Sequence, residues 1–228
     1  MASEETSRTT GSVRTQDMSV SWISEPGLNN ENTDRIGILT MANGQIRLTM
    51  QSSTINLKGM RLTKGHICVF ALFEAAGNDT NEAAAADKAS EVFINNVMKY
   101  DITKKPAASV LKKCLSKADK AARKEFGNAG YKASVAAFAG KDMTACSVNG
   151  ARMLISHEDR SIREISSPVT EILPIGASWK NVMMFSGGIT ADRDTIEDDM
   201  RSSIGDLAAK KSMRELSLSS SIIRVQKI

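Results

Sequence analysis

An acidic side chain follows directly on the longest uninterrupted apolar stretch of this chain. Residues 67–73 read I-C-V-F-A-L-F, a composition typical of a strand covered on both faces, and Glu74 comes next in E-A-A-G-N. A carboxylate at the end of a buried strand is a hard oxygen donor that can coordinate a divalent cation. Glu74 is therefore the residue around which we look for chemistry.

Few other residue types in the sequence could do chemistry. His66 and His157 are the two histidines and lie far apart, so a histidine-based zinc site or a Ser-His-Asp triad is not expected, although two histidines do not formally exclude a triad. The cysteines are odd in number and widely spaced, which favours buried reduced thiols: Cys68, Cys114 and Cys146. No G-x-x-x-x-G-K-S/T or G-x-G-x-x-G phosphate loop occurs.

Two clusters of charge have both a structural and a functional interpretation. Acids gather at the start of a predicted helix, where the helix dipole favours them, and we prefer that interpretation to a metal site: Asp192, Asp194, Glu197, Asp198 and Asp199. Lysines form a row on one face of another predicted helix: Lys113, Lys117, Lys120 and Lys124. Such a row is usually a solvated surface, and it is also the candidate binding face for a protein partner.

The order of the predicted elements indicates an α+β fold. Hydrophobic periodicity predicts helices over residues 81–100, 105–126 and 194–211. Alternating or continuous apolar runs predict strands over residues 18–23, 35–41, 45–51, 67–73, 131–139, 143–148, 152–156, 161–165, 169–173, 182–185 and 221–228. The strands from 131 to 165 have the order of a meander. This succession predicts two antiparallel sheets packed face to face, with helices on the outer faces.

Composition limits the class of protein. The chain of 228 residues is 41% hydrophobic and 25% charged, which suits one globular domain, and we expect it over residues 18–228 after a flexible polar tail at 1–17. No apolar run is long enough to span a bilayer, and the start of the chain lacks the apolar core of a secretory signal. We expect a cytoplasmic or nuclear protein. Nucleic acid is not expected as a partner, because a net charge of +4 and an aromatic content of 4% are weak signals for it.

The stretch F-A-L-F-E-A-A-G-N resembles the strand and turn F-x-V-F-D-G-H-G-G of type 2C metal-dependent Ser/Thr protein phosphatases. The resemblance covers the chain from about Val20 onward and rests on the ordered succession of segments. W-I-S-E-P-G-L-N-N-E-N resembles the opening strand and Asn-Glu-Asp element, while C-S-V-N-G-A-R-M-L resembles V-A-N-V-G-D-S-R-A-V-L. Further on, V-M-M-F-S-G-G-I-T resembles L-I-L-A-S-D-G-L-W, and S-S-S-I-I-R-V resembles the closing strand.

At the matched positions the family's metal-binding side chains are changed. By this resemblance, five positions no longer carry the Asp, or the Asp-Asn pair, that the family has there: Asn32, Glu74, Gly150, Gly187 and Ser220, the last together with Ser219. We call these positions degenerate. Glu31 matches the family, so Glu31 and Glu74 are the weak candidates for metal binding. The family's phosphate-binding Arg is missing, and its substrate-flanking flap is shortened to residues 166–181.

The resemblance implies a phosphatase fold with too few carboxylates for a bridged pair of Mg²⁺ or Mn²⁺ ions. The first hypothesis is that the chain is a pseudophosphatase, not an enzyme and without a cofactor, which binds a protein partner such as a kinase or phosphoprotein in signalling. The alternative is a divergent, weakly active metal-dependent Ser/Thr phosphatase that uses Mg²⁺ or Mn²⁺. Nucleic-acid binding through the lysine row is a third hypothesis, supported by charge alone.

Overall fold

The computed structural model describes residues 9–14, 18–25, 33–42, 45–50, 53–57, 67–77, 79–100, 106–186 and 220–228. Its strands are β1 Thr9–Arg14, β2 Met18–Glu25, β3 Arg35–Ala42, β4 Gln45–Met50, β5 Ser53–Leu57, β6 Ile67–Ala75, β7 Tyr131–Ala139, β8 Asp142–Val148, β9 Arg152–His157, β10 Ile162–Ile165, β11 Glu171–Gly176, β12 Trp179–Phe185 and β13 Ser220–Lys227. Its helices are α1 Thr80–Val97 and α2 Ala107–Phe126. None of the helices in these ranges is long and apolar enough to cross a membrane.

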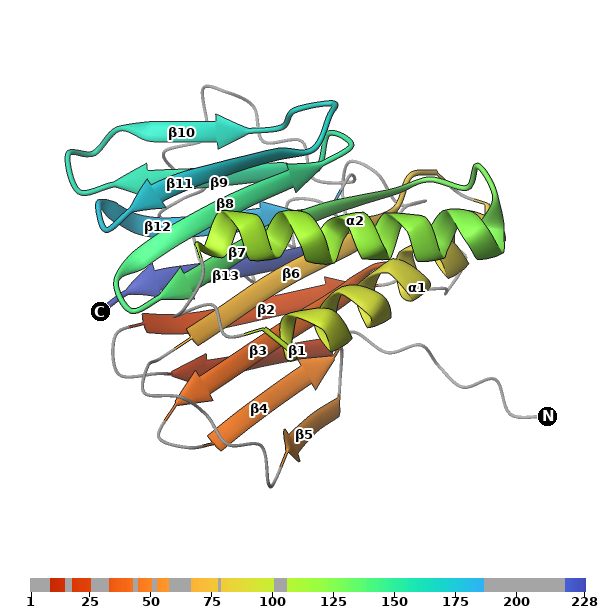
Figure 1. The fold of residues 1–228 in the computed structure, drawn as a ribbon. Helices are drawn as coiled ribbons and strands as arrows, with labels where there is room; N and C mark the ends of the chain where they lie inside the picture. Colours follow the sequence, from red (N-terminus) through yellow and green to blue (C-terminus); the bar gives the residue numbers. More distant parts are fainter. Residues whose placement is uncertain are drawn as a thin grey trace.

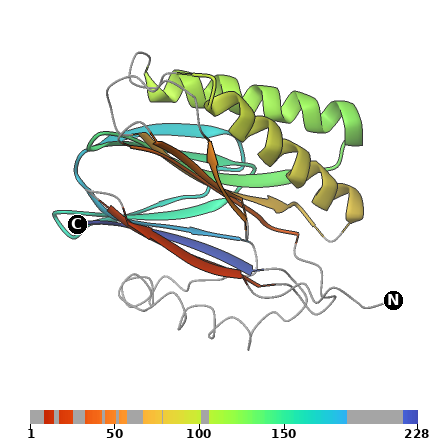
Figure 2. The same ribbon diagram turned by 90° about the horizontal axis from the view of Figure 1, so that it is seen from below.

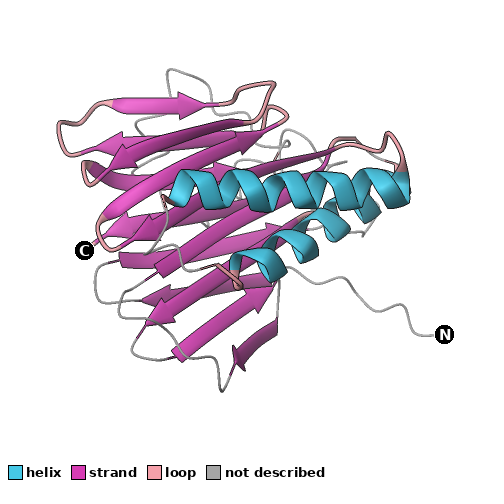
Figure 3. Cartoon of the chain, in the orientation of Figure 1, coloured by secondary structure: helices cyan, strands magenta, loops and turns pink. Residues whose placement is uncertain are grey.

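The strands form two antiparallel sheets that lie face to face (Figures 1 and 3). The first sheet has the order β1-β2-β13-β12-β9-β10, and the second has the order β11-β8-β7-β6-β3-β4-β5. Strands β6 and β7 lie at the centre of the second sheet, which explains why both are apolar on their two faces. The closing strand β13 pairs with β2, so the two ends of the chain meet in the first sheet.

Both helices cover the outer face of the second sheet, as the view in Figure 2 shows. Helix α1 begins with a capping box, in which the Asp79 carboxylate accepts a hydrogen bond from the backbone of Asn81 at 2.9 Å and the Glu82 side chain returns to the backbone of Asp79. Helix α2 ends at Gly127, whose φ of 64° lies in the left-handed region that glycine tolerates. An ion pair of 3.3 Å between Lys88 and Glu125 joins the middle of α1 to the end of α2.

Alternate residues of the second sheet enter two separate cores. On β6, Val69 and Phe73 pack with the helices, and the Phe73 ring lies 5.5 Å from that of Phe93 on α1. Phe70 points the other way, into the core between the sheets, where its ring lies 5.5 Å from that of Phe138. The ring of Trp179, on the first sheet, completes this inner core at 4.7 Å from Phe138. The same alternation determines which side chains at the end of each strand point into the space between the sheets.

The predicted α+β sandwich is confirmed, and several details are corrected. Residues Thr9–Arg14 form strand β1 along β2, so the predicted flexible tail at 1–17 does not hold for this segment. Strand β5 at Ser53–Leu57 was not predicted. The predicted meander is wrong, because the chain leaves the second sheet after β8 and continues in the first sheet as β9 and β10. The helix predicted at 194–211 lies outside the described residues.

A candidate acidic site at one end of the sandwich

Both sheets present polar side chains at the same end of the inter-sheet core. Strands β6, β8, β2 and β12 end there, while β3, β7, β9 and β13 begin there, as their antiparallel pairing requires. The buried polar side chains at this end come from both sheets: Ser24, Asp34, Glu74, Ser134, Ser147, Ser186 and Ser221. Most of the buried polar side chains that the structure describes are thus gathered at one end of the sandwich, which we call the polar end.

Glu74 lies at this end and points between the sheets. It continues the alternation of Phe70 and Leu72, which belong to the inner core, and it is only 6% exposed. Asp34, which is 2% exposed, continues the same inner face of β3 ahead of Ile36. The last pair of the β3–β6 register sets Arg35 opposite Phe73, so the next step sets Asp34 opposite Glu74. The fold therefore brings two buried carboxylates together from segments forty positions apart.

The neighbouring Arg35 fixes the start of β3. Its guanidinium points to the opposite face and forms an ion pair with Asp87 on α1, with a second contact of 2.8 Å from Arg35 Nη2 to Asp87 Oδ2. Its Nη1 also donates to the backbone oxygen of Asp34 at 3.0 Å. Burial lowers the pKa of Arg35, and the charge of Asp34 opposes that shift. Arg35 thus connects the backbone of Asp34 to helix α1 and fixes its position.

A lysine lies beside the acid pair. Lys132 on β7 is the cross-strand partner of Glu74, so both side chains lie on the same face of the second sheet. Within the described residues, Lys132 forms no ion pair with a carboxylate. An ammonium group at this position can bind an anion that approaches Glu74 and Asp34. Sequence reasoning missed both Asp34 and Lys132, because their proximity to Glu74 arises only from strand register.

Serine hydroxyls line the same end of the first sheet. The hydroxyl groups of Ser24 and Ser221 lie 2.7 Å apart. The backbone of Ser221 donates to Ser186 Oγ at 2.8 Å, and the backbone of Ser186 donates to the oxygen of Ser221 at 3.0 Å. These bonds tie β2, β13 and β12 together. Among the described residues, the buried side chains of the first sheet that face Glu74 at this end offer neutral hydroxyl oxygens.

The turn from β8 to β9 lies at this end as well. Asn149 and Gly150 both have positive φ, at 54° and 80°, which suits the Asn-Gly sequence of a tight turn. Gly150 donates to the backbone oxygen of Ser167 at 2.7 Å, and Ser147 Oγ donates to that of Ala151 at 2.7 Å. The backbone conformation accounts for a glycine at a position where the resembling family has Asp.

The other predicted site positions are dispersed or lie outside the described part. Glu31, Asn32 and Gly187 fall outside the described residues, as do the acids of the 192–199 cluster. Ser220 is the first residue of β13 and pairs in register with Glu25. The lysine row is exposed on α2, which packs against the outer face of the second sheet and not in the inter-sheet core.

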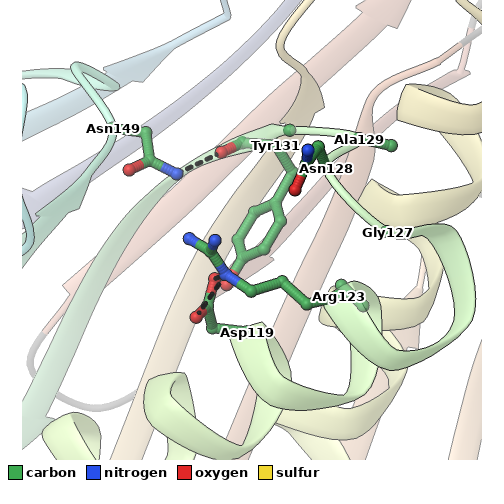
Figure 4. A pocket seen from close by; sticks show the side chains of 9 residues that line it. Asp119, Arg123, Gly127, Asn128, Ala129, Tyr131 and Asn149 are labelled. Carbon is green, nitrogen blue, oxygen red and sulfur yellow. Dashed lines mark hydrogen bonds and ion pairs between the residues drawn. The ribbon is translucent and has the colours of Figure 1, made fainter.

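A separate pocket of about 290 Å³ lies between the end of α2, the loop 127–130 and the β8–β9 turn (Figure 4). Tyr131 forms its floor and points toward Asp119 and Arg123, which form an i, i+4 ion pair of 2.9 Å. The Asn149 amide donates to the backbone oxygen of Tyr131 at 2.8 Å. The Tyr131 hydroxyl is buried and has no hydrogen-bond partner among the described residues, and burial raises its pKa.

The donors at the polar end suit one small divalent cation better than two. Mg²⁺ is commonly held by one or two carboxylates and keeps several waters, which matches a pair such as Asp34 and Glu74. Two bridged ions would need more carboxylates, and no group of three or more His, Cys, Asp or Glu side chains able to hold a metal occurs within the described ranges. The residues present therefore fit a single ion.

No family model and no curated protein matches the chain. The solved structures that match include serine/threonine phosphatases, among them a serine-threonine phosphatase 2C from Toxoplasma gondii. RsbX in complex with magnesium matches with a TM-score of 0.63 and 11% identity over 96% of this chain and 100% of that one. The Mycobacterium tuberculosis serine/threonine phosphatase PstP matches with a TM-score of 0.64 and 11% identity over 92% of this chain and 98% of that one. PppA, from Pseudomonas aeruginosa, matches with a TM-score of 0.62 and 12% identity over 96% of this chain and 100% of that one. The chain thus has a phosphatase 2C-like fold.

The expectation that the chain is not an enzyme is corrected. The structures that share its fold include serine/threonine phosphatases, one of them in complex with two manganese ions, and no feature of the described residues marks this protein as inactive. The expectation rested on the carboxylates lost at matched positions. It did not take account of Asp34, which the register of β3 and β6 sets beside Glu74.

Proposed function

We propose that this protein is a divergent, weakly active metal-dependent phosphatase that acts on phosphorylated serine or threonine in proteins. The observation that carries the proposal is the buried pair of carboxylates, Asp34 and Glu74, with Lys132 beside it at the polar end of a phosphatase 2C-like sandwich. A bound divalent cation would supply positive charge to the phosphoryl oxygens and lower the pKa of water.

The chain's own residues supply the remaining requirements. Asp34 and Glu74 would hold the cation from the second sheet, where their burial limits competition from solvent for their oxygens. Lys132 binds the phosphoryl group of the substrate, the role that an arginine has in the resembling family. The hydrogen-bonded serines tie β2, β13 and β12 together and so fix the first sheet where it faces Glu74.

A single ion with two carboxylates is a weaker electrophile than a bridged pair, and we expect slow turnover for that reason. The protein would therefore act on phosphoproteins in signalling, where recognition of the partner matters as much as rate. A kinase or its phosphorylated substrate is the class of partner that this function requires.

The test is Mn²⁺-dependent hydrolysis of a phosphoserine peptide by the full chain. We expect measurable turnover in the wild type and a loss of at least about tenfold in Glu74→Gln and in Asp34→Asn, because each change removes one charge from the cation site. Lys132→Met should raise the KM more than it lowers kcat. Asp142→Asn is the matched control, since Asp142 is exposed at the opposite end of β8. Turnover unchanged by Glu74→Gln, or absent from the wild type, would refute the proposal.

A further inference from the structure

The lysine row of α2 carries positive charge that no described acid neutralises. Lys113, Lys117, Lys120 and Lys124 follow one another at intervals of four, three and four residues, so they form one stripe along the helix. The stripe is about 16 Å long, from eleven residues at 1.5 Å each. None of the four lysines forms an ion pair with a described carboxylate.

The two acids of the helix are already paired with other cations. Asp119 accepts from Arg123 Nε at 2.9 Å, and Glu125 pairs with Lys88 of α1 at 3.3 Å. The helix dipole explains only one end of the stripe. It favours Lys124, which lies in the last turn of α2, but it does not favour Lys113, which lies in the first half of the helix.

One end of the stripe forms a small built site with the end of α1. Lys117 Nζ lies 2.8 Å from Asn96 Oδ1 and 3.4 Å from the Tyr100 hydroxyl. Both Lys113 and Lys117 also lie over the Tyr100 ring, at 5.3 Å and 5.6 Å from its centroid. The two ammonium groups are thus held close together around one phenol, and their charges lower the pKa of Tyr100, with the hydrogen bond from Lys113 as the largest cause.

We propose that this face of α2 binds an acidic segment of a protein partner, with one carboxylate of that segment held between Lys113, Lys117 and Tyr100. In an extended peptide, every second side chain lies on the same side, at a spacing of about 6.6–6.8 Å. Lysines four residues apart on a helix are spaced by roughly 6 Å along its axis, so alternate acids of the peptide can each approach one lysine. The proposal is independent of the phosphatase chemistry, because it concerns the outer face of the helix layer.

The neighbourhood of the stripe favours a narrow acidic peptide over a membrane or nucleic acid. A membrane-binding face needs apolar side chains to insert, but the large hydrophobic side chains exposed in the described part of the chain are Val169 and Ile228, which lie on neither helix. The four lysines form one narrow line along α2, which suits a single extended peptide strand better than a broad polyanion.

The test is fluorescence anisotropy with a labelled peptide of about eight residues that alternates Glu and Ser. The wild type should bind it at low salt, and the affinity should fall as salt rises. Lys120→Glu with Lys124→Glu should weaken binding about tenfold, because each exposed ion pair contributes a factor of roughly 1.4 to 5 and reversal adds repulsion. Lys141→Glu with Lys180→Glu gives the same change in net charge at exposed positions elsewhere and should bind like the wild type.

A second substitution isolates the built site. Tyr100→Phe keeps the ring under the two ammonium groups but removes the hydroxyl. It should therefore lower the affinity for the peptide by a small factor and leave the urea unfolding curve unchanged. Equal binding by the wild type and the Lys120/Lys124 variant would overturn the proposal, and so would an equal loss in the Lys141/Lys180 control. Duplex DNA or anionic vesicles that bind this face while the peptide does not would also overturn it.

Discussion

Tyr131→Phe should stabilise the protein, although it removes a polar group from a buried position. The Tyr131 side chain is 2% exposed, and its hydroxyl has no hydrogen-bond partner in the described part of the chain. A buried polar group left without a partner costs about 1–3 kcal/mol. Phenylalanine keeps the ring, which lies 5.8 Å from that of Phe73. We therefore expect the free energy of unfolding to rise by about 1 kcal/mol at neutral pH, from the low end of that range.

The pH dependence gives the same substitution a second, independent readout. Burial raises the pKa of Tyr131 in the folded state, with Asp119 adding to the shift, whereas the unfolded tyrosine ionises near pH 10. The folded state then binds the proton more tightly, so the stability from this group is complete below pH 10 and is lost as the pH rises further. At pH 11 the loss in the wild type is about 1.4 kcal/mol, and the phenylalanine variant does not suffer it.

Urea unfolding of both proteins at pH 7 and at pH 11 measures these differences. The stabilisation of Tyr131→Phe should be present at pH 7 and larger at pH 11. Tyr100→Phe is the matched control. Because the pKa of Tyr100 is lowered and not raised, replacing Tyr100 should not give a stabilisation that grows between pH 7 and pH 11. A phenylalanine variant that is less stable than the wild type at pH 7 would refute the reasoning. It would show that a water or ligand in the pocket satisfies the hydroxyl.

Two further outcomes follow from the cores. Phe93→Ala should lower the free energy of unfolding by about 3–5 kcal/mol, because the fully buried ring fills the space between α1 and β6. A loss below about 1 kcal/mol in urea unfolding would show that this core is not packed as described. The cysteines should resist iodoacetamide in the native protein at pH 8 and react fully in urea, since all three are buried and burial raises the pKa of Cys114 to about 11 and of Cys146 to about 12. Rapid labelling of the folded protein, followed by mass spectrometry, would contradict this.

The sequence allowed the local elements to be predicted well. The apolar run before Glu74, the amphipathic pattern of α2 and the reversal between β3 and β4 each depend on neighbouring residues, and all are found in the structure. Strand β1 was missed because its residues are mostly polar and small, and β5 because its alternation of Ile55 and Leu57 with polar residues spans only five positions.

Long-range pairing could not be predicted in the same way. The Asn149-Gly150 turn indicates that the chain reverses, but it does not show that β8 and β9 enter different sheets. The same limit applies to the candidate site. Asp34 carries no local signal, since it is one acid next to a strand, and it becomes a neighbour of Glu74 only when β3 pairs with β6. Matching positions to a family by sequence found the changed carboxylates but did not pick out Asp34.

The most direct test of the proposed cation site is a titration of the metal-free protein with Mn²⁺, in which electron paramagnetic resonance measures the free ion. We predict one bound ion per chain, with an affinity that falls at least about tenfold in Glu74→Gln and in Asp34→Asn and stays unchanged in Asp142→Asn. If the protein binds no Mn²⁺ across the titration, or if Glu74→Gln binds it as tightly as the wild type, the account is contradicted.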